Sequence, residues 1–316
     1  MLEKLKIVIA LGGNALQSKD SAPTAEAQLS VIKQTCERIA DIRLQGYDII
    51  LVHGNGPQIG RIILACEAAK DVVPPMPFDV CGAMSQGYIG YHLQQSLRYA
   101  LNQRGCKTEV VTLATQVLVA RNDPAFLVPS KPIGPFYSQH EAEVLTREKG
   151  YIMREDAGRG CRRVVGSPLP QRIVEINAIK KMAETAIVIT CGGGGIPVIE
   201  NTDGSLEGVA AVIDKDFAAE LLAEELNADI LLILTEVERV AINFNTPQQR
   251  DLSRLTLVRA NRYIKEGHFS PGSMLPKIQA ALKFVHRYPK RRAIITSLDK
   301  ALQALEGKTG TTVEFS

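Results

Sequence analysis

Three lysines stand where a positive charge is unfavourable unless an anion lies beside it. Lys215 is flanked by Asp214 and Asp216 at the start of an amphipathic run, and Lys277 follows a proline that fits the first position of a helix. Because a helix N-terminus already carries partial positive charge, a lysine there indicates a bound anion. Lys131, in the stretch S-K-P-I-G, is a third candidate, although an exposed lysine in a proline-rich loop explains it equally well.

Glycines follow three apolar stretches that are typical of buried strands. The pairs are K-I-V-I-A-L before Gly12-Gly13-Asn14, I-I-L-V before His53-Gly54-Asn55-Gly56, and I-V-I-T-C before the four glycines 192–195. Since glycine has no Cβ and tolerates positive φ, successive N–H groups in such loops can point at one anion. None of the loops is a Walker A motif or a dinucleotide fingerprint, and a plain glycine-rich turn is the alternative. Three such loops together favour a phosphate-rich ligand held by backbone amides.

Lysines beside glycine loops are typical of phosphoryl transfer, in which positive charge and in-line placement matter more than covalent chemistry. His53 could be a general base, but a loop histidine satisfied by its surroundings is the commoner case. No serine or cysteine stands in a G-x-S-x-G or comparable nucleophile setting. The residues therefore favour electrostatic stabilisation of a phosphoryl group.

The elements that must position these residues alternate between strand and helix. Strands are predicted at 6–11, 49–52, 110–113, 187–190, 230–235 and 293–297, and helices from Thr24 to Gly46 and at 84–104, 216–226 and 276–286. Continuous apolar strands joined by helices are typical of parallel sheets buried on both faces. The sequence therefore predicts an α/β fold, a three-layer αβα sandwich with a mainly parallel open sheet. Ligands of such sheets bind at the carboxyl ends of the strands, where all three glycine loops fall.

One region interrupts this alternation. Four prolines (124, 129, 132 and 135) and a basic run that includes Arg162 and Arg163 lie within about 122–168. We expect an inserted, protruding lobe there, within a single domain of residues 1–316. Residues 1–190 are expected to hold the smaller substrate and residues 191–316 the nucleotide.

Composition excludes several classes of function. The chain has 316 residues and a formal net charge of +3, which argues against nucleic acid or a membrane surface as the main partner. No apolar run is long enough to span a bilayer, and the N-terminus does not resemble a signal peptide. Six scattered cysteines without a C-x-x-C pair indicate reduced thiols of a cytoplasmic protein.

The motifs follow one another as they do in the carbamate kinases. They are L-G-G-N-A-L, H-G-N-G-P-Q, S-Q-G-Y-I-G-Y, N-D-P-A-F, S-K-P-I-G, R-E-D-A-G-R-G, R-R-V-V, G-G-G-G-I-P-V, V-I-D-K-D, G-S-M-L-P-K and K-T-G-T. The resemblance covers essentially the whole chain. It implies the amino-acid kinase fold and reversible phosphoryl transfer between ATP and carbamate, giving ADP and carbamoyl phosphate, with ATP formation as the expected direction in the cell.

The resemblance also implies roles for particular residues. Lys131, Lys215 and Lys277 resemble the phosphate-binding lysines of the family, and Asp216 the carboxylate that holds them. The residues expected around the acyl phosphate are Gly12, Gly13, Asn14, Gly54, Asn55 and Gly56. Those expected around the nucleotide are Gly194, Asp214, Thr235, Glu236, Val237, Gly272, Ser273 and Met274. Mg²⁺ is expected on the nucleotide phosphates, since no carboxylate cluster in the sequence offers a complete cage.

One position separates this family from others with the same fold. Acetylglutamate kinases, aspartokinases and uridylate kinases resemble one another in a lysine just before the first glycine loop, where this chain has Ala10. Carbamate kinases also lack it, and Lys215 is expected to replace its charge. A kinase of another small carboxylate, or a silent nucleotide-binding regulator, is the alternative.

Two further expectations concern assembly and motion. The family forms homodimers, and the stretch from Gly82 to Leu101 is the candidate contact, with Gly87 and Gly90 allowing close approach; an ordinary core helix is the alternative. The lobe is expected to act as a lid that swings to bring Lys131 to the site.

Overall fold

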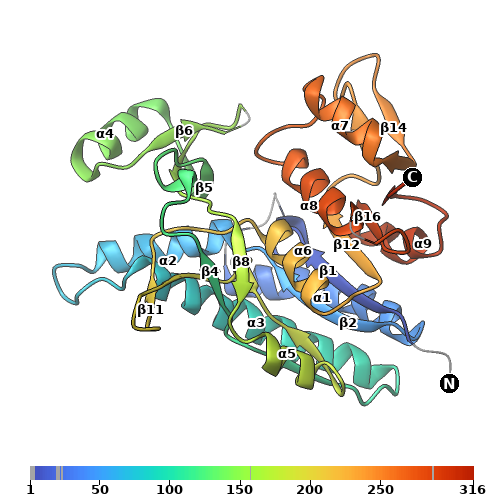
Figure 1. Ribbon diagram of the computed structural model, residues 1–316. Coiled ribbons are helices and arrows are strands. Elements are labelled where there is room, and N and C mark those ends of the chain that lie inside the picture. The colour runs from blue at the N-terminus through green and yellow to red at the C-terminus, as the bar shows by residue number, and fades with distance from the viewer. Residues whose placement is uncertain (1–3, 19–21, 23, 157, 287) are drawn as a thin grey trace.

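Eight strands form the central sheet of the computed structural model, which describes residues 4–18, 22, 24–156, 158–286 and 288–316 (Figure 1). In spatial order they are β15 (Arg254–Thr256), β17 (Thr311–Glu314), β16 (Arg292–Ser297), β12 (Ile230–Thr235), β1 (Lys6–Leu11), β2 (Asp48–His53), β9 (Ala186–Ile189) and β3 (Glu109–Thr112). Every neighbouring pair is parallel except β16 and β17, which run antiparallel. The prediction of an open, mainly parallel sheet is confirmed.

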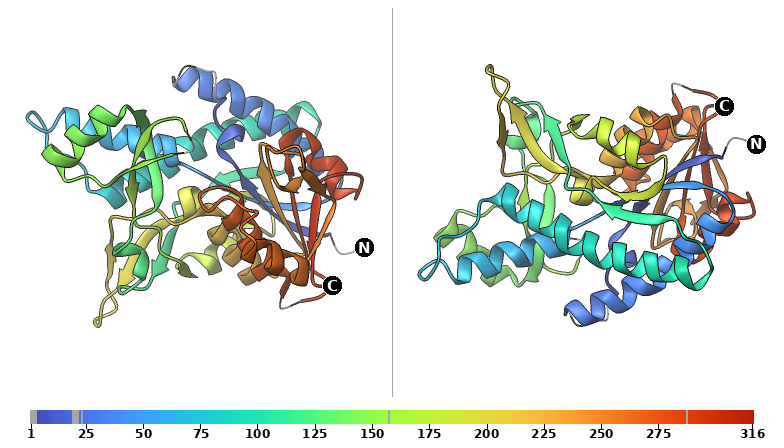
Figure 2. Two further views of the ribbon diagram at one scale, coloured as in Figure 1. Left: turned by 90° about the horizontal axis from the view of Figure 1, so that it is seen from above. Right: turned by 90° about the horizontal axis from the view of Figure 1, so that it is seen from below.

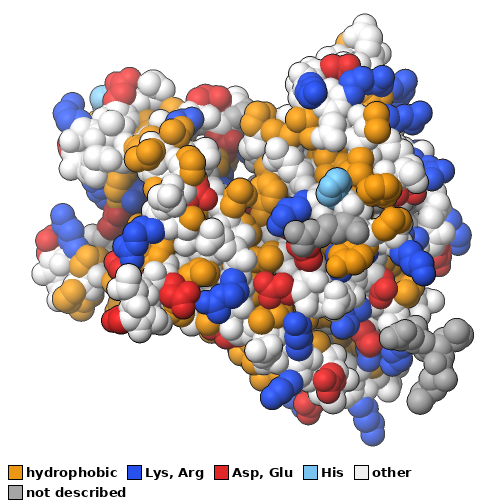
Figure 3. Space-filling view, in the orientation of Figure 1, with side chains coloured by type: hydrophobic (Ala, Val, Ile, Leu, Met, Phe, Trp, Pro, Cys, Tyr) orange, Lys and Arg blue, Asp and Glu red, His pale blue; other side chains and the backbone are white. Residues whose placement is uncertain are grey.

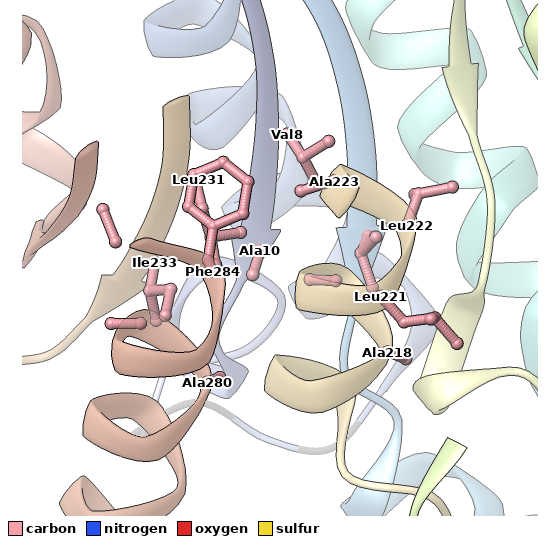
Figure 4. Close-up of a cluster of buried hydrophobic side chains, with 14 of the residues drawn as sticks. Val8, Ala10, Ala218, Leu221, Leu222, Ala223, Leu231, Ile233, Ala280 and Phe284 are labelled. Carbon is pink, nitrogen blue, oxygen red and sulfur yellow. The ribbon is translucent and has the colours of Figure 1, made fainter. Parts of the chain in front are cut away.

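Helices cover both faces of this sheet (Figure 2). On one face lie α1 (Ala25–Leu44), α3 (Phe78–Gln103) and α9 (Ala301–Leu305), and on the other lie α6 (Lys215–Glu225) and α8 (Met274–His286). Side chains of β1 alternate between the layers: Ile7 and Ile9 pack with α1 and α3, whereas Val8 and Ala10 pack with α6 and α8 (Figure 4). The predicted three-layer αβα sandwich is therefore confirmed. Within the described ranges, no helix combines the length and apolar character needed to cross a membrane.

The predicted elements agree with the structure more closely for strands than for helix starts. The strands expected at 110–113, 187–190, 230–235 and 293–297 lie within one residue of β3, β9, β12 and β16. The helix expected from residue 84 begins six residues earlier, at Phe78, after Pro77. Helix α8 begins at Met274, so Pro276 is its third residue rather than its first. Proline is tolerated there because the first four N–H groups of a helix have no partner within it.

A second sheet was not predicted. It has four strands in the order β11 (Leu206–Gly208), β10 (Ile196–Glu200), β4 (Gln116–Val119) and β8 (Pro170–Ile173). Further unpredicted elements are α2 (Gly56–Ala68), α5 (Ile176–Met182), α7 (Leu257–Lys265) and the hairpin β13 (Val240–Ile242) and β14 (Arg250–Leu252). These strands have three to five residues, which is too short for a clear periodicity.

A small sheet of its own builds the protruding lobe, which stands apart from the C-terminal helices in Figure 1. It contains β5 (Lys131–Tyr137), β7 (Cys161–Val165) and β6 (Met153–Glu155), together with α4 (Gln139–Lys149). Helix α2 supports it at two places. Gly60 lies so close to Gly134 that a Cβ on Gly60 would collide with the Gly134 Cα, and Glu67 accepts from Lys149 at 2.6 Å and pairs with Arg163 at 3.6 Å.

Two glycines of α3 differ in what surrounds them, which gives a stability prediction. A Cβ on Gly90 would collide with Thr112 Cγ2 of β3, whereas a Cβ on Gly82 would meet Ile59 Cδ1 at 3.8 Å, an ordinary contact. We expect Gly90→Ala to lower the free energy of unfolding by about 1–3 kcal/mol, because overpacking outweighs the gain in helix propensity. Gly82→Ala, the matched control, should be neutral or stabilising by up to about 1 kcal/mol. Urea unfolding at one fixed protein concentration measures both, and equal stability of the two variants would contradict the packing argument.

Candidate active site

Three glycine loops meet at one edge of the large sheet. The loops at 12–14, 54–56 and 192–195 follow β1, β2 and β9, which are adjacent parallel strands. The Gly54 N–H donates to the Leu11 carbonyl, at the end of the neighbouring strand. The prediction that these loops share the carboxyl edge of the sheet is confirmed.

Backbone N–H groups in these loops are available to a ligand. Those of Gly13, Asn14, Asn55, Gly56, Gly192 and Gly193 are among the ones that donate no hydrogen bond to any residue that the structure describes. Backbone donors removed from bulk water are almost always paired in folded proteins. Asn55, Gly192 and Gly193 are buried, so this group of N–H donors at one sheet edge is suited to an anion with several oxygens.

The four consecutive glycines are required by the protein's own packing. Gly193, Gly194 and Gly195 have φ values of 68°, 94° and 91°, a region that disfavours side chains. A Cβ on Gly192 would collide with His53 Nε2, and one on Gly193 with the Asn55 side chain. The sequence indicated a close approach to this backbone, and the structure shows that neighbouring side chains make it.

His53 is a structural residue of this edge. Its side chain is buried, and its Nδ1 lies 2.9 Å from the Gly54 carbonyl, which makes Nδ1 the protonated nitrogen. Burial lowers the pKa of His53 to about 4, against a smaller opposing effect of the hydrogen bond to Gly54. The ring is therefore neutral at pH 7 and a weak base, consistent with the interpretation of His53 as a satisfied loop histidine.

Three lysines converge on two aspartates beside the loops. Lys215 Nζ lies 2.6 Å from Asp216 Oδ1, and Lys277 Nζ lies 3.2 Å from Asp216 Oδ2. Lys131 Nζ lies 2.5 Å from Asp214 Oδ2. The side chain of Asp216 is only 3 % exposed. The structure thus brings together residues that are up to 146 positions apart, between Lys131 and Lys277.

Opposite charges decide the protonation of this cluster. Burial opposes ionisation of Asp216, but Lys215 and Lys277 outweigh it and hold the pKa of Asp216 well below its usual range. Burial lowers the pKa of Lys215 despite the nearby Asp216. For Lys277 the carboxylates outweigh burial, and its pKa is raised. At neutral pH the carboxylate of Asp216 is therefore the fixed charge of the site.

The start of α6 explains why a lysine is tolerated there. Asp214 is the N-cap and accepts from the Asp216 N–H at 2.9 Å through Oδ1. Lys215, the first helical residue, extends over Gly54, where a Cβ would lie 3.3 Å from its Cδ. The anion that the sequence required beside this lysine is thus, first of all, the protein's own Asp216.

Lys131 reaches the site without any movement of the lobe. It is the first residue of β5 and already contacts Asp214, and the Pro132 carbonyl lies within 3.6 Å of the position of a Cβ on Gly56. Lys131 therefore needs no swing of the lobe to reach the carboxylates of the sheet edge, contrary to the expectation, whereas closure of the lobe over bound ligands stays a prediction. The physical reason is that Asp214 offers the ammonium group a counter-charge before any ligand binds. Figure 3 shows the open notch between the lobe and the part that carries α7 and α8.

The residues expected around the nucleotide lie at two places. Ser273 and Met274 are at the start of α8, where the Ser273 carbonyl accepts from Lys277 Nζ at 3.1 Å. Thr235 ends β12, and its carbonyl accepts from Asn14 Nδ2 at 3.1 Å. Gly194 lies in the glycine turn against Ile213, Gly272 precedes α8, and Glu236 and Val237 follow β12. A cavity of about 590 Å³ beneath α1 is lined in part by Asn14 and Glu236.

Buried polar residues next to the loops were not assigned by the sequence. Ser85 of α3 accepts from Asn55, and Gln86 of α3 donates to Gly192. Gln86 also exchanges hydrogen bonds with the backbone of Thr115, which follows β3. Ser85 and Gln86 open the motif S-Q-G-Y-I-G-Y, and two polar residues inside an otherwise apolar helix are a signal for such contacts.

Comparison with known proteins places these features among relatives. Residues 6–297 match the amino acid kinase family. The chain is 55 % identical to a carbamate kinase of Clostridium perfringens over 313 residues, 98 % of this chain and 99 % of the relative. It is also similar to two solved structures of the carbamate kinase of Giardia lamblia, one bound to citric acid and one to AMP-PNP. Their TM-scores are 0.94 and 0.90, each with 42 % identity and full coverage of both chains.

The buried carboxylate yields a prediction about stability and pH. Asp216→Asn leaves Lys215 and Lys277 without their shared counter-charge, so the free energy of unfolding should fall by about 3–5 kcal/mol at pH 7. Since the folded-state pKa of Asp216 lies below its unfolded value of about 3.9, its contribution is complete above that value and is lost as pH falls further. The difference between wild type and Asp216→Asn should therefore shrink in urea unfolding near pH 3. Asp71→Asn, an exposed control, should change stability little at either pH.

Proposed function

This chain belongs to the amino acid kinase family and, within it, to the carbamate kinases, and from that premise we propose how its residues transfer a phosphoryl group between ATP and carbamate. The reaction is reversible and joins carbamate and ATP to carbamoyl phosphate and ADP. ATP formation from carbamoyl phosphate is the direction that we propose for the cell.

The observation that carries the proposal is the balance of charge beside the glycine loops. Three ammonium groups share two carboxylates, which leaves one net positive charge, and the same edge holds the loop N–H groups that donate to no described residue. A transferring phosphoryl group spreads negative charge over three oxygens. Donors that are already in place can stabilise this charge without reorganising during the reaction.

In the proposed mechanism Lys215 and Lys277 bind oxygens of the transferring phosphoryl group. Asp216 holds both ammonium groups at its two oxygens and so sets their separation. The backbone amides of the loops at 12–14 and 54–56 bind the carbamoyl side of the substrate. Both loops lie within residues 1–190, the part of the chain expected to hold the smaller substrate. Lys131 supplies a further charge from the lobe, and closure of the lobe on bound ligands excludes water from the reactive acyl phosphate.

Ala10 fits this assignment. Its side chain is fully buried among apolar residues of α6 and α8 (Figure 4), an environment that offers no partner for a charge. Lys215 instead brings its ammonium group from α6 across Gly54. The charge that other kinases of this fold place before the first glycine loop is therefore proposed to come from Lys215.

The nucleotide is proposed to bind on the side of β12 and the start of α8, near Thr235, Glu236, Val237 and the residues 272–274. The AMP-PNP complex of the Giardia relative supports a nucleotide site on this fold. Among the described residues, no three His, Cys, Asp or Glu side chains form a metal-binding group. The four oxygens of Asp214 and Asp216 already accept from lysines or a backbone amide. These residues do not fit a protein-held ion, so Mg²⁺ is proposed to be carried by the nucleotide phosphates, where it would supply additional positive charge.

The cysteines support the proposed cellular setting. All six are free, and Cys36, Cys81, Cys161 and Cys191 are buried. Free thiols in this number suit a reducing compartment. Cytoplasmic location is therefore part of the proposal.

The lysines provide the test of the mechanism. We expect Lys215→Ala and Lys277→Ala each to lower kcat by roughly 10²–10³, the loss typical of one preorganised donor, with a much smaller change in KM for ADP. The assay couples ATP formation from ADP and carbamoyl phosphate to a reporter enzyme, with acetyl phosphate as the alternative donor. Lys265→Ala, an exposed lysine of α7, is the control and should retain full turnover.

Two results would contradict this assignment. Near-full turnover of Lys215→Ala would refute the replacement of the missing lysine by Lys215. Equal use of acetyl phosphate and carbamoyl phosphate by the wild type would favour a kinase of another small carboxylate.

A homodimer through α3 is the second part of the proposal. The outer face of this helix exposes Val80, Met84, Tyr91 and Tyr99. Between them, Gly87 has nothing within 4 Å of the position of a Cβ, so no contact inside the chain requires a glycine there. An exposed glycine inside a helix destabilises it by about 1 kcal/mol relative to alanine. Close approach of α3 from a second copy of the chain would explain why position 87 is a glycine.

Gly90 does not take part in that contact. The sequence suggested that Gly87 and Gly90 together allow two helices to approach, but Gly90 faces Thr112 of β3 inside the chain. Its missing side chain makes room for the sheet. Only Gly87 therefore remains as the small residue of the proposed interface.

Sedimentation tests the interface. We expect Tyr91→Asp to sediment as a monomer at a concentration where the wild type is a dimer, because a charge would be buried without a partner. Val72→Asp, which changes an exposed apolar residue outside α3, should leave the dimer intact. An unchanged sedimentation coefficient for Tyr91→Asp would exclude this face of α3.

A further inference from the structure

Gln86 joins two of the loops at the sheet edge through a single side chain. It lies on α3, is 2 % exposed, and uses both ends of its amide. Nε2 donates to the Gly192 carbonyl at 2.9 Å and to the Thr115 carbonyl at 3.1 Å, while Oε1 accepts from the Thr115 N–H at 2.9 Å. Both donors and the acceptor of this buried amide are thus satisfied, and all of their partners are loop backbone.

Thr115 and Gly192 are the points from which the glycine turn is held. Thr115 accepts from Ile196 N–H through its carbonyl at 2.8 Å and from Cys191 N–H through Oγ1 at 3.2 Å. Gly192 accepts from Gly195 N–H at 3.1 Å. Because Gln86 binds both Thr115 and Gly192, it fixes the two ends of the turn relative to each other. The two N–H groups left free in this turn, those of Gly192 and Gly193, take their direction from that arrangement.

Ser85 holds the second glycine loop, at 54–56, through a hydrogen bond of its own. Its hydroxyl donates to the Gly82 carbonyl at 2.6 Å, so its oxygen is left to accept from Asn55 Nδ2 at 2.8 Å. Consecutive residues of one helix therefore hold the loops that follow β2, β9 and β3. Asn55 in turn packs against Gly193, which links the two held loops directly.

We propose that Gln86, supported by Ser85, is a positioning residue that aims the amides of Gly192 and Gly193 at the phosphoryl oxygens during transfer. This inference rests on the proposed function, which places the transferring phosphoryl group at the sheet edge where the glycine loops meet, and it assigns the amides of the third loop to that group. Gln86 does not contact the substrate in this proposal and acts through the backbone of the turn at 192–195. Displacement of reacting groups by about 1 Å lowers rates by about 10²-fold, so a buried link of this kind affects turnover more than affinity.

The test removes the hydrogen bonds while keeping the volume. Gln86→Met should lower kcat for ATP formation by roughly 10–10²-fold, with KM for ADP changed by less than about twofold. Ser85→Ala should lower kcat by a smaller factor in the same direction. Tyr88→Phe is the matched control, because it removes a 2.9 Å hydrogen bond to Gln28 from the same helix without touching the loops. If Gln86→Met lowers the melting temperature yet loses no more turnover than Tyr88→Phe, the residue is merely structural and the proposal is overturned.

A binding measurement separates this inference from the reaction itself. With glycine labelled by ¹⁵N, the amide signals of Gly192 and Gly193 should shift when inorganic phosphate is added to the wild-type protein, and shift less in Gln86→Met. Equal shifts in both proteins would overturn the positioning role. A wild type that forms no ATP but shows the phosphate shifts, reduced in Gln86→Met, would refute the proposed reaction and leave the role of Gln86 supported.

Discussion

The carboxylate of Asp216, buried between Lys215 and Lys277, is the interaction on which the site depends. Two ammonium groups cannot remain charged and close together out of water unless a counter-charge lies between them. Each oxygen of Asp216 takes one lysine, so the carboxylate sets both their protonation and their separation. Because Asp216 and Lys215 belong to α6 and Lys277 to α8, the contact between Asp216 and Lys277 also joins two helices that cover this face of the sheet.

Helix α3 connects this site to the rest of the molecule. Ser85 and Gln86 face inward and hold the loops after three adjacent strands, while Met84 and Gly87, next to them in sequence, face outward. Packing of Gly90 against Thr112 keeps the helix close to β3. The outer face of α3 is therefore separated from the glycine turn only by the width of this helix.

Glycine has two different uses around the site. In the turn at 192–195 the absence of side chains makes room for His53, Asn55 and Ile213, so these positions serve internal packing. Gly13, by contrast, has nothing within 4 Å of the position of a Cβ, and its N–H donates to no residue in the described part of the chain. Packing around the glycines at 192–195 fixes the positions of their N–H groups, and the open space beside Gly13 leaves room for a ligand. The sequence shows only that glycines are present, because both uses have the same spacing relative to the preceding strand.

Much of the fold could be predicted from local patterns. Continuous apolar runs predicted six of the eight strands described in the central sheet, since a strand buried on both faces needs apolar residues throughout. The second sheet was not predicted because its strands have only three to five residues, and three of the four carry a proline or a charged residue that interrupts the apolar pattern. Pro276 misled the placement of α8, because proline is compatible with any position of the first helical turn.

The sequence by itself determined the chemistry of the site: which lysines stand at helix starts, which loops are rich in glycine, and, through the order of its motifs, the resemblance to carbamate kinases. Only the tertiary structure decided which charges meet. Three contacts join residues that are 61 to 106 positions apart in the sequence. Lys277 shares Asp216 with Lys215, Lys131 contacts Asp214, and Gln86 binds Gly192. Such pairings depend on how strands and helices are arranged in space, and the spacing of residues along the sequence does not directly indicate that arrangement.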